Sequence, residues 1–335
     1  MLCSGKGSPP DNGEGSGAVL ICNHKEISLM KHVAKNTPLE NLEFQGGYNL
    51  EFILCPLCGG KDFKRLVVEQ LIPIVRCRNC SLAFANPRPD AQGLMRFYEN
   101  YFPSESAPLW QKQMSQIFLI EGLYRIMDFQ ASHGLILSNP PRILDVGCGM
   151  GFFLDLMRKK GWTTKGVEPS SEAVKHARQN LGLDVVQGVI ESLDPTADAP
   201  YDVVTLWYVM EHVPNPEKIL ALAAQFLKPG GLLIIRVPNQ NASIDQWLGV
   251  LGLGRFFLIN PPRHLFDYSP QTMSRFLIKY GFKVLDIRNG IPRKTGTPFE
   301  LLRRHLWYGL FEILYRFSNG KIIRGSSMTV YAQKQ

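Results

Sequence analysis

The chain has 335 residues, of which 45% are hydrophobic, and a formal net charge of +8. This length suits a catalytic domain of roughly 190 residues with an N-terminal appendage, and the hydrophobic fraction is enough for a real core. The positive charge raises the question of nucleic acid, but the sequence has no run of basic residues and no aromatic stacking motif. We therefore do not expect nucleic acid to be a partner.

The first 50 residues contain the stretch SGKGSPPDNGEGSG and show no periodicity. This composition predicts a largely disordered leader over residues 1–50. The apolar segment 18–22 is far too short to span a bilayer, and no other segment reaches the necessary length. Because no secretory signal is recognisable, we expect a cytoplasmic protein, with peripheral membrane contact as an option.

Four cysteines predict a metal site directly after the leader. Cys55 and Cys58 form one CxxC pair, Cys77 and Cys80 form a second, and 18 residues separate the pairs. This spacing is typical of a zinc ribbon, here residues 51–87, with strands at 63–69 and 72–76. Four thiolates leave no position for water, so the zinc is expected to be structural. Disulfides are the weaker alternative without a secretory signal.

The ribbon contains too few apolar residues to fold alone, so metal binding would supply its folding free energy. We expect it to have a core separate from that of the catalytic domain. Replacing Cys58 would then unfold the ribbon and leave cofactor binding intact.

Residues 88–140 are predicted to be a helical connector. Prolines at 87 and 89 mark a boundary and precede a helix that carries Tyr98 and Tyr101. A longer helix over 109–133 leads to the first strand. The two tyrosines are candidates for the wall of a binding site, and packing of the helix on the sheet is the equal alternative.

The stretch ILDVGCGMGFFL, residues 143–154, predicts a buried strand, a glycine turn and a helix. Glycine lets the backbone come close to a ligand, and the free N–H groups of the helix point towards it. A dinucleotide site is less well matched, because its fingerprint requires glycine where this chain has Phe152. A second strand over 163–167 ends at Glu168, which can accept hydrogen bonds from both hydroxyls of a ribose.

Strands and helices alternate over the rest of the chain. Further strands are predicted at residues 184–187, 201–206, 232–237, 283–288 and 327–332, with a helix over 269–280 before the sixth. This order predicts an α/β fold with a Rossmann-like, seven-stranded sheet over residues 141–335.

Asp145, the glycine turn and Glu168 resemble motif I and the following strand of the class I S-adenosylmethionine-dependent methyltransferases. The resemblance extends over roughly residues 142–335. The resemblance implies S-adenosyl-L-methionine as cofactor and residues 88–140 as its cover. An ordinary doubly wound domain with tight turns is the alternative. The implied cofactor-binding residues are Asp145, Gly147, Cys148, Gly149, Gly151, Glu168, Val189, Ile190 and Trp207.

Residues 207–214, WYVMEHVP, resemble the LEHVPDP-type segment of the ubiquinone-biosynthesis O-methyltransferases. His212 has a suitable pKa to remove a proton from a hydroxyl, and Glu211 is expected to orient it or to bind a divalent ion. The alternative is that this segment packs on the cofactor or fixes the loop.

An insertion over residues 239–266 is expected to be an acceptor lid. Its PRHL segment resembles the same relatives and supplies His264 as a second catalytic base, with Arg263 for an anionic acceptor. The alternative is that His264 bonds to backbone and holds the lid closed.

Residues 298–318 form a predicted amphipathic helix, and residues 292–324 contain seven Lys or Arg against two Glu. Such a helix fits an anionic membrane surface through residues 298–317. Packing on the sheet or on a second subunit is the alternative.

Together these features predict a methyltransferase with a zinc ribbon that acts on a small-molecule acceptor, a hydroxyl of a sugar, quinone-like or lipid-linked intermediate. The ribbon and Tyr-rich helix resemble a bacterial group of which some members act on sugars. Sugar C-methylation is the alternative reaction. A non-enzymatic alternative is an adaptor that binds nucleic acid or protein and has an inactive methyltransferase domain. The oligomeric state is not predicted.

Overall fold

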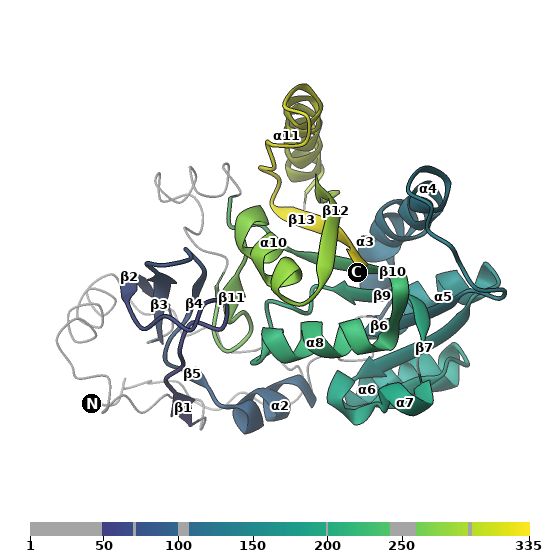
Figure 1. Cartoon of the computed structure of the whole chain (residues 1–335), viewed down its shortest axis with the longest axis horizontal. Coiled ribbons are helices and arrows are strands. Elements are labelled where there is room, and N and C mark those ends of the chain that lie inside the picture. The colour runs from purple at the N-terminus through teal and green to yellow at the C-terminus, as the bar shows by residue number, and fades with distance from the viewer. Residues whose placement is uncertain (1–48, 70–71, 100–106, 199, 242–258, 294–296) are drawn as a thin grey trace, which may run out of the picture. The chain divides into compact units, whose positions relative to one another are not determined.

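The computed structural model describes residues 49–335 apart from 70–71, 100–106, 199, 242–258 and 294–296 (Figure 1). The predicted leader therefore lies almost wholly outside the described residues, as do Tyr101 and the middle of the predicted lid. All described residues belong to one unit, residues 43–335.

A seven-stranded mixed sheet in the order β12-β13-β10-β9-β6-β7-β8 forms the centre, which confirms the predicted fold class. The strands β6 to β10 run parallel to one another, and β13 is antiparallel to both β10 and β12. The chain order reverses on the two sides of β6, the position at which such sheets open a binding crevice. The strands are β6 (Arg142–Val146), β7 (Thr163–Glu168), β8 (Val185–Gln187), β9 (Tyr201–Trp207), β10 (Leu227–Pro238), β12 (Phe282–Asn289) and β13 (Ser327–Lys334).

Apolar runs explain the central strands. All seven residues of β9 are buried, as expected for a parallel strand that is covered on both faces. The strand β10 begins at Leu227, earlier than the predicted start at residue 232. Its register on β9 shifts between Leu227 and Leu232, where Gly230 has a φ of +74°. The residues between these two positions therefore form an irregularity within one long strand.

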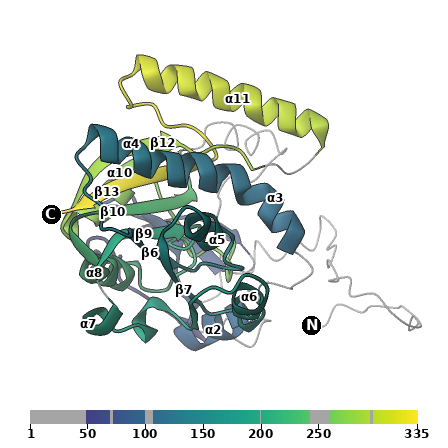
Figure 2. The ribbon, with the colours of Figure 1, turned by 90° about the vertical axis from the view of Figure 1, so that its right-hand side faces the viewer.

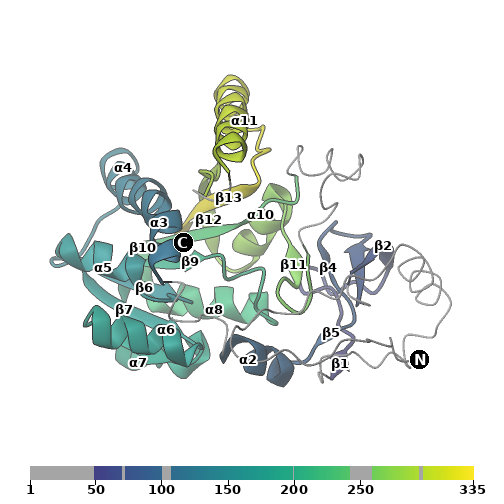
Figure 3. The same ribbon diagram turned by 180° about the vertical axis from the view of Figure 1, so that it is seen from behind.

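Helices cover both faces of the sheet (Figures 1 and 3). On one face α8 (Pro216–Phe226) and α10 (Pro270–Lys279) share a core with the strands. The other face packs against α5 (Phe152–Lys159) and α6 (Ser171–Lys175), and against the predicted connector helix. That helix consists of α3 (Ala107–Ile117), a π-helical segment η3 (Phe118–Tyr124) and α4 (Arg125–Ser132).

The predicted ribbon strands are β2 (Phe63–Glu69) and β3 (Ile72–Cys77), which pair antiparallel. They continue into β4 (Ala83–Ala85), and the sheet gains a fourth strand, β11 (Phe266–Asp267), from the end of the predicted lid. A segment far along the chain thus completes the ribbon (Figure 1).

The expectation of separate cores is wrong. Three of the four ribbon cysteines and Phe84 belong to the same buried cluster as Phe266, Tyr268 and Phe276 of the catalytic part. The ring centroids of Phe84 and Phe266 lie 6.1 Å apart. Because the ribbon alone offers few apolar side chains, it buries them against β11 and α10 instead.

A buried ion pair joins the connector to the sheet. Arg236 on β10 has no exposed surface, and its guanidinium pairs with Glu121 of η3. The same guanidinium donates to the hydroxyl of Ser327 at 2.8 Å, and Thr329 donates to Glu121. The π-helical segment therefore places a carboxylate where Arg236 and Thr329 of the sheet both meet it.

We predict that Glu121→Ala lowers the free energy of unfolding by about 3–5 kcal/mol, because it leaves the Arg236 guanidinium buried without its counter-charge. Urea denaturation measures this. The matched control is Asp62→Ala, which removes the exposed pair with Arg78 (3.1 Å) and should change little. Equal midpoints for the two variants would contradict the prediction.

Candidate active site

A cavity of about 950 Å³ lies at the carboxyl ends of β6, β7 and β9. Asp145, Glu168 and Trp207, the polar or aromatic residues at those strand ends, line it together with the glycine turn. Residues from α2 (Ala91–Glu99), α3 and the segment after β12 close its other end. One cavity therefore contains residues of both the predicted cofactor site and the predicted acceptor site.

The glycine turn follows β6 as predicted, but its glycines have different roles. Gly147 lines the cavity at a φ of +68°, and a Cβ there would lie 2.6 Å from Val209. Gly151 caps α5 at a φ of +82° and is not among the cavity-lining residues. A Cβ at Gly151 would lie 2.6 Å from Leu183, so this glycine allows the helix to pack closely.

Asp145 and Cys148 are both buried beside this turn. The hydroxyl of Thr205 donates to Asp145 at 2.6 Å, and burial raises the pKa of Asp145 to about 8. Burial, Asp145 and Glu168 also raise the pKa of Cys148 well above its ordinary value. A thiol of this kind is a packing group and a poor nucleophile.

Glu168 is fixed at the end of β7 by two backbone donors. The N–H groups of Gly149 and Ser170 each donate to its carboxylate at 2.9 Å. Burial nevertheless raises the pKa of Glu168 to about 6. Val189 and Ile190, at the start of η5 (Ile190–Ser192), follow the neighbouring strand β8 and also line the cavity.

Trp207 ends β9 with its indole at the cavity wall. Its ring meets those of Phe118 and Phe153 at centroid distances of 5.5 and 5.1 Å. Its buried Nε1 has no hydrogen-bond partner among the described residues. A buried donor of this kind is costly unless a ligand accepts from it.

The three predicted catalytic residues lie together at the other end of the cavity. One ligand atom each of Glu211, His212 and His264 lie within 4.8 Å of one another, close enough to hold a metal ion. The Nε2 atom of His212 is 3.8 Å from Oε1 of Glu211, and the rings of the two histidines are 4.8 Å apart. Burial raises the pKa of Glu211 to about 8.

The surroundings of His212 assign its tautomer. Its Nδ1 lies within hydrogen-bond distance of the carbonyl oxygen of Arg263, which can only accept. The hydroxyl of Tyr98 donates to the same carbonyl at 2.6 Å and lies 2.9 Å from Nδ1. Neutral His212 therefore carries its proton on Nδ1 and a lone pair on Nε2. Burial and His264 hold the pKa of His212 well below its ordinary value, which keeps it neutral.

Sequence reasoning missed an aromatic and cationic wall. The Arg293 guanidinium lies 3.9 Å from the ring centroid of Tyr208 and 5.2 Å from that of Trp110. Tyr208 has a φ of +60°, and Arg236 donates to its hydroxyl at 2.8 Å. Burial would raise the pKa of Tyr208, but Arg236 and Arg293 lower it. The only signal in the sequence is that Tyr208 directly follows a strand.

The four cysteines of the ribbon converge as predicted. Their sulfur atoms lie within 4.8 Å of one another, with 3.4 Å between Cys55 and Cys80 and 3.5 Å between Cys58 and Cys77. Burial raises the pKa of Cys55, although the backbone N–H groups of Cys58 and Leu57 act against this. Such N–H groups around a buried sulfur suit a thiolate, so the set fits a cation.

In the part of the chain that the structure describes, no helix has the length and apolar composition required to cross a membrane.

Known proteins resemble the catalytic part of the chain. A family model described as a methyltransferase domain matches residues 116–287. The ubiquinone biosynthesis O-methyltransferase of Thiobacillus denitrificans is 33% identical over 172 residues, which cover 49% of this chain and 70% of that protein. The protein of the same name from Azoarcus sp. is 33% identical over 173 residues, covering 49% and 72%.

Among solved structures, magnesium protoporphyrin IX methyltransferase from Synechocystis with bound SAH has a TM-score of 0.46 and 14% identity. The match covers 72% of this chain and 100% of that chain.

We predict that Glu211→Gln stabilises the protein at high pH. The folded-state pKa of Glu211, about 8, exceeds its ordinary value of 4.5, so the stability linked to its protonation is present below about pH 4.5 and is lost as the pH rises through about 8. The variant should match the wild type near pH 5 and gain about 4 kcal/mol near pH 9. Urea denaturation at the two pH values measures this.

Glu191→Gln is the control, because Glu191 belongs to a surface pair with Lys218 at 3.6 Å and should follow the wild type at both pH values. A Glu211→Gln curve parallel to that control would show that Glu211 ionises normally.

Proposed function

The chain belongs to the class I S-adenosylmethionine-dependent methyltransferases, as its sequence predicted, and we propose that it methylates a hydroxyl group of a small molecule. The observation that carries this proposal is a partly buried, neutral histidine in the cavity that is also lined by Glu168 and the glycine turn. A hydroxyl acceptor needs such a base, because it loses its proton as the methyl group arrives. The curated relatives named as O-methyltransferases support the same acceptor atom.

The residues at the strand ends fit the cofactor. We assign Glu168 to the ribose hydroxyls, Val189 and Ile190 to the adenine, and the turn at Gly147 and Gly149 to the methionine part. The orphaned indole N–H of Trp207 and the close backbone of the turn support this fit. When bound, S-adenosylmethionine supplies a methyl group that its positive sulfur already activates.

The chain's own contribution is then to position the acceptor and to take its proton. The lone pair on Nε2 of His212 would receive the hydroxyl proton, and Nδ1 stays fixed by the Arg263 carbonyl. Glu211, 3.8 Å from Nε2, would stabilise the imidazolium once the carboxylate is ionised. Most of the rate would come from holding the acceptor against the methyl group.

Sugar C-methylation uses the same cavity and differs in the atom that loses the proton. The adaptor alternative is not supported, because the chain belongs to a methyltransferase family and its cavity is lined by Asp145, Gly147, Gly149 and Glu168. The absence of nucleic acid among the partners stays a prediction.

We predict that His212→Ala lowers turnover by about 10²-fold or more, with His264→Ala as the parallel test of the second candidate. Product S-adenosylhomocysteine is measured with a panel of sugar, quinol and lipid-linked hydroxyl compounds. Wild-type turnover should fall as the pH drops through the pKa of His212, well below 6.5, and this limb should vanish in the variant.

Calorimetric titration with S-adenosylhomocysteine is the control for that experiment. Both histidine variants should retain the wild-type affinity, whereas Glu168→Ala should bind more weakly because it lacks the ribose acceptor. Near-normal turnover and an unchanged pH profile in both histidine variants would refute a histidine base. Absence of binding to the wild type would refute the assigned cofactor site.

We also propose that the four ribbon cysteines hold one structural zinc ion. A tetrahedral set of thiolates with backbone N–H donors suits this ion, and it leaves no open position for catalysis. Two side chains of α10 reach the ribbon, since Arg275 donates to the carbonyl of Cys80 at 3.3 Å and Lys279 to that of Leu57 at 3.1 Å. The ion would therefore support α10 and β11 as well as the ribbon.

We predict one tightly bound zinc per chain and its loss in Cys58→Ser. Because the cores are shared, hydrogen exchange should accelerate in β11 and in the second half of α10 as well as in the ribbon. Metal analysis and exchange mass spectrometry check this. Cys148→Ala, at a buried cysteine outside the cluster, should keep its zinc; an equal loss there, or none in Cys58→Ser, would contradict the assignment.

A further inference from the structure

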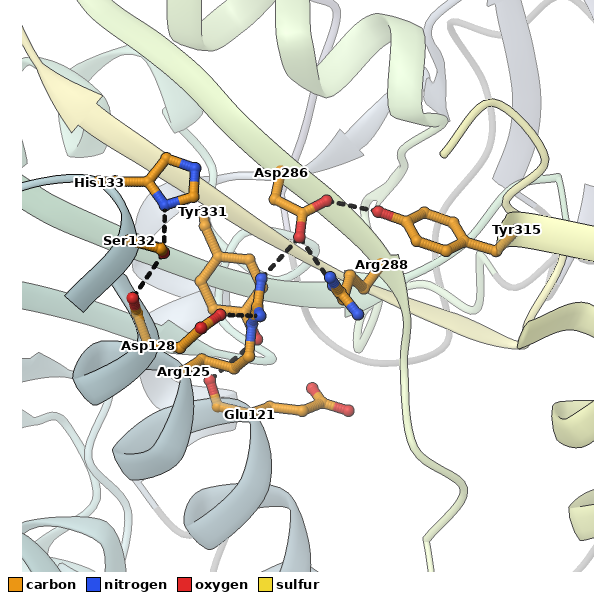
Figure 4. A network of polar contacts seen from close by, with 9 residues as sticks. All are labelled: Glu121, Arg125, Asp128, Ser132, His133, Asp286, Arg288, Tyr315 and Tyr331. Carbon is orange, nitrogen blue, oxygen red and sulfur yellow. Dashed lines mark hydrogen bonds and ion pairs between the residues drawn. The ribbon is translucent and has the colours of Figure 1, made fainter. Parts of the chain in front are cut away.

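The helix α11 (Pro298–Phe317) packs on the edge of the sheet with one face only. Phe311 and Tyr315 on that face are buried, and the hydroxyl of Tyr315 donates to Asp286 of β12. Arg125 of α4 pairs with the same carboxylate at 2.6 Å (Figure 4). The backbone carbonyl of Phe311 also accepts from Asn289 at 3.2 Å. These contacts fix which side of the helix faces outward.

The outward side is an apolar stripe. Figure 2 shows α11 running along the outside of the molecule, above α3 and α4. Large side chains recur at spacings of four, four, three and four residues, which places them on one face of a helix. They are Leu302 (59% exposed), Leu306 (66%), Leu310 (43%), Ile313 (52%) and Phe317 (86%).

The charges beside this stripe are positive. With about 100° per residue, Arg303 and Arg316 flank it on opposite sides. Lys321 and Arg324 are exposed just beyond the helix end. Glu312 is the acidic residue of α11 whose side chain the structure describes, and one of its carboxylate oxygens is buried towards the protein. The outward face therefore combines large apolar side chains with cations.

We propose that this face of α11 docks the enzyme onto an anionic lipid surface. Five apolar side chains would enter the interface, and the flanking cations would meet lipid phosphates. A second copy of the chain fits the face less well, because symmetric pairing would bring the same arginine side chains together. The positive charge of this face therefore favours an anionic lipid surface over a second copy of the chain.

The docking face also bears on the acceptor. Arg304, on the inner side of the same helix, lines the acceptor cavity together with Arg293 and Trp110. One helix therefore contacts lipid with its outer face and the cavity with its inner face. This arrangement favours an amphiphilic acceptor, with its hydroxyl head in the cavity and its apolar part in the bilayer. This inference about the acceptor rests on the proposed function.

Co-sedimentation of the full-length chain with vesicles tests the proposal, without cofactor or acceptor. The wild type should sediment with vesicles of equal parts phosphatidylcholine and phosphatidylglycerol, but not with phosphatidylcholine alone. Leu306→Gln should reduce binding about tenfold, since the exposed leucine side chain would no longer enter the interface. The matched control is Ile278→Gln on α10, 64% exposed, which should bind like the wild type. Arg316→Gln should weaken binding at low salt only.

Equal binding by the Leu306 and Ile278 variants, or no binding of the wild type to anionic vesicles, would overturn the proposal. A purified dimer that Leu306→Gln dissociates without vesicles would overturn it in favour of self-association. Methyl transfer to a soluble acceptor is measured separately. Vesicle binding without methyl transfer would count against the proposed function alone. Methyl transfer without vesicle binding would count against the docking role of α11 alone.

Discussion

A guanidinium that is fully removed from water needs counter-charge and acceptors on every side, and Arg236 obtains them from four different parts of the chain. Glu121 comes from η3, Tyr208 from the end of β9, Ser327 from β13, and the carbonyl of Ile291 accepts at 2.6 Å from the segment after β12. Loss of any partner would leave a buried charge poorly compensated. The cover helix, the strand ends and the segment that carries Arg293 are therefore held in one arrangement.

The ribbon and the acceptor site are connected in a similar way. β11 pairs with β4 of the ribbon, and the residue before it, Leu265, donates to the carbonyl of Glu211 at 2.7 Å. Two residues earlier, the carbonyl of Arg263 fixes the tautomer of His212. The four-cysteine module thus supports the segment on which the proposed base depends, although its cysteines lie far from the proposed active-site residues in sequence.

The strands, the cysteine cluster and the placement of the glycine turn could be predicted because each has a local signal: an apolar run, a paired spacing, or a small residue at a required bend. The shared core, the short strand β11 and the Arg236–Glu121 pair could not. Two residues are too few to show a strand period, and nothing near Glu121 in sequence indicates a partner 115 positions away. The packing role of Gly151 could not be predicted either, since its close approach to Leu183 depends on the folded arrangement.

The family match begins at residue 116, after the ribbon, so a shortened protein that starts there would retain every strand of the large sheet. It would also lose β4, and β11 would become an open edge beside the uncovered rings of Phe266 and Tyr268. Unpaired edges with exposed aromatic groups promote aggregation. The N-terminal module therefore also covers an aggregation-prone edge of the catalytic part, and it prevents that edge from contacting other molecules during and after folding.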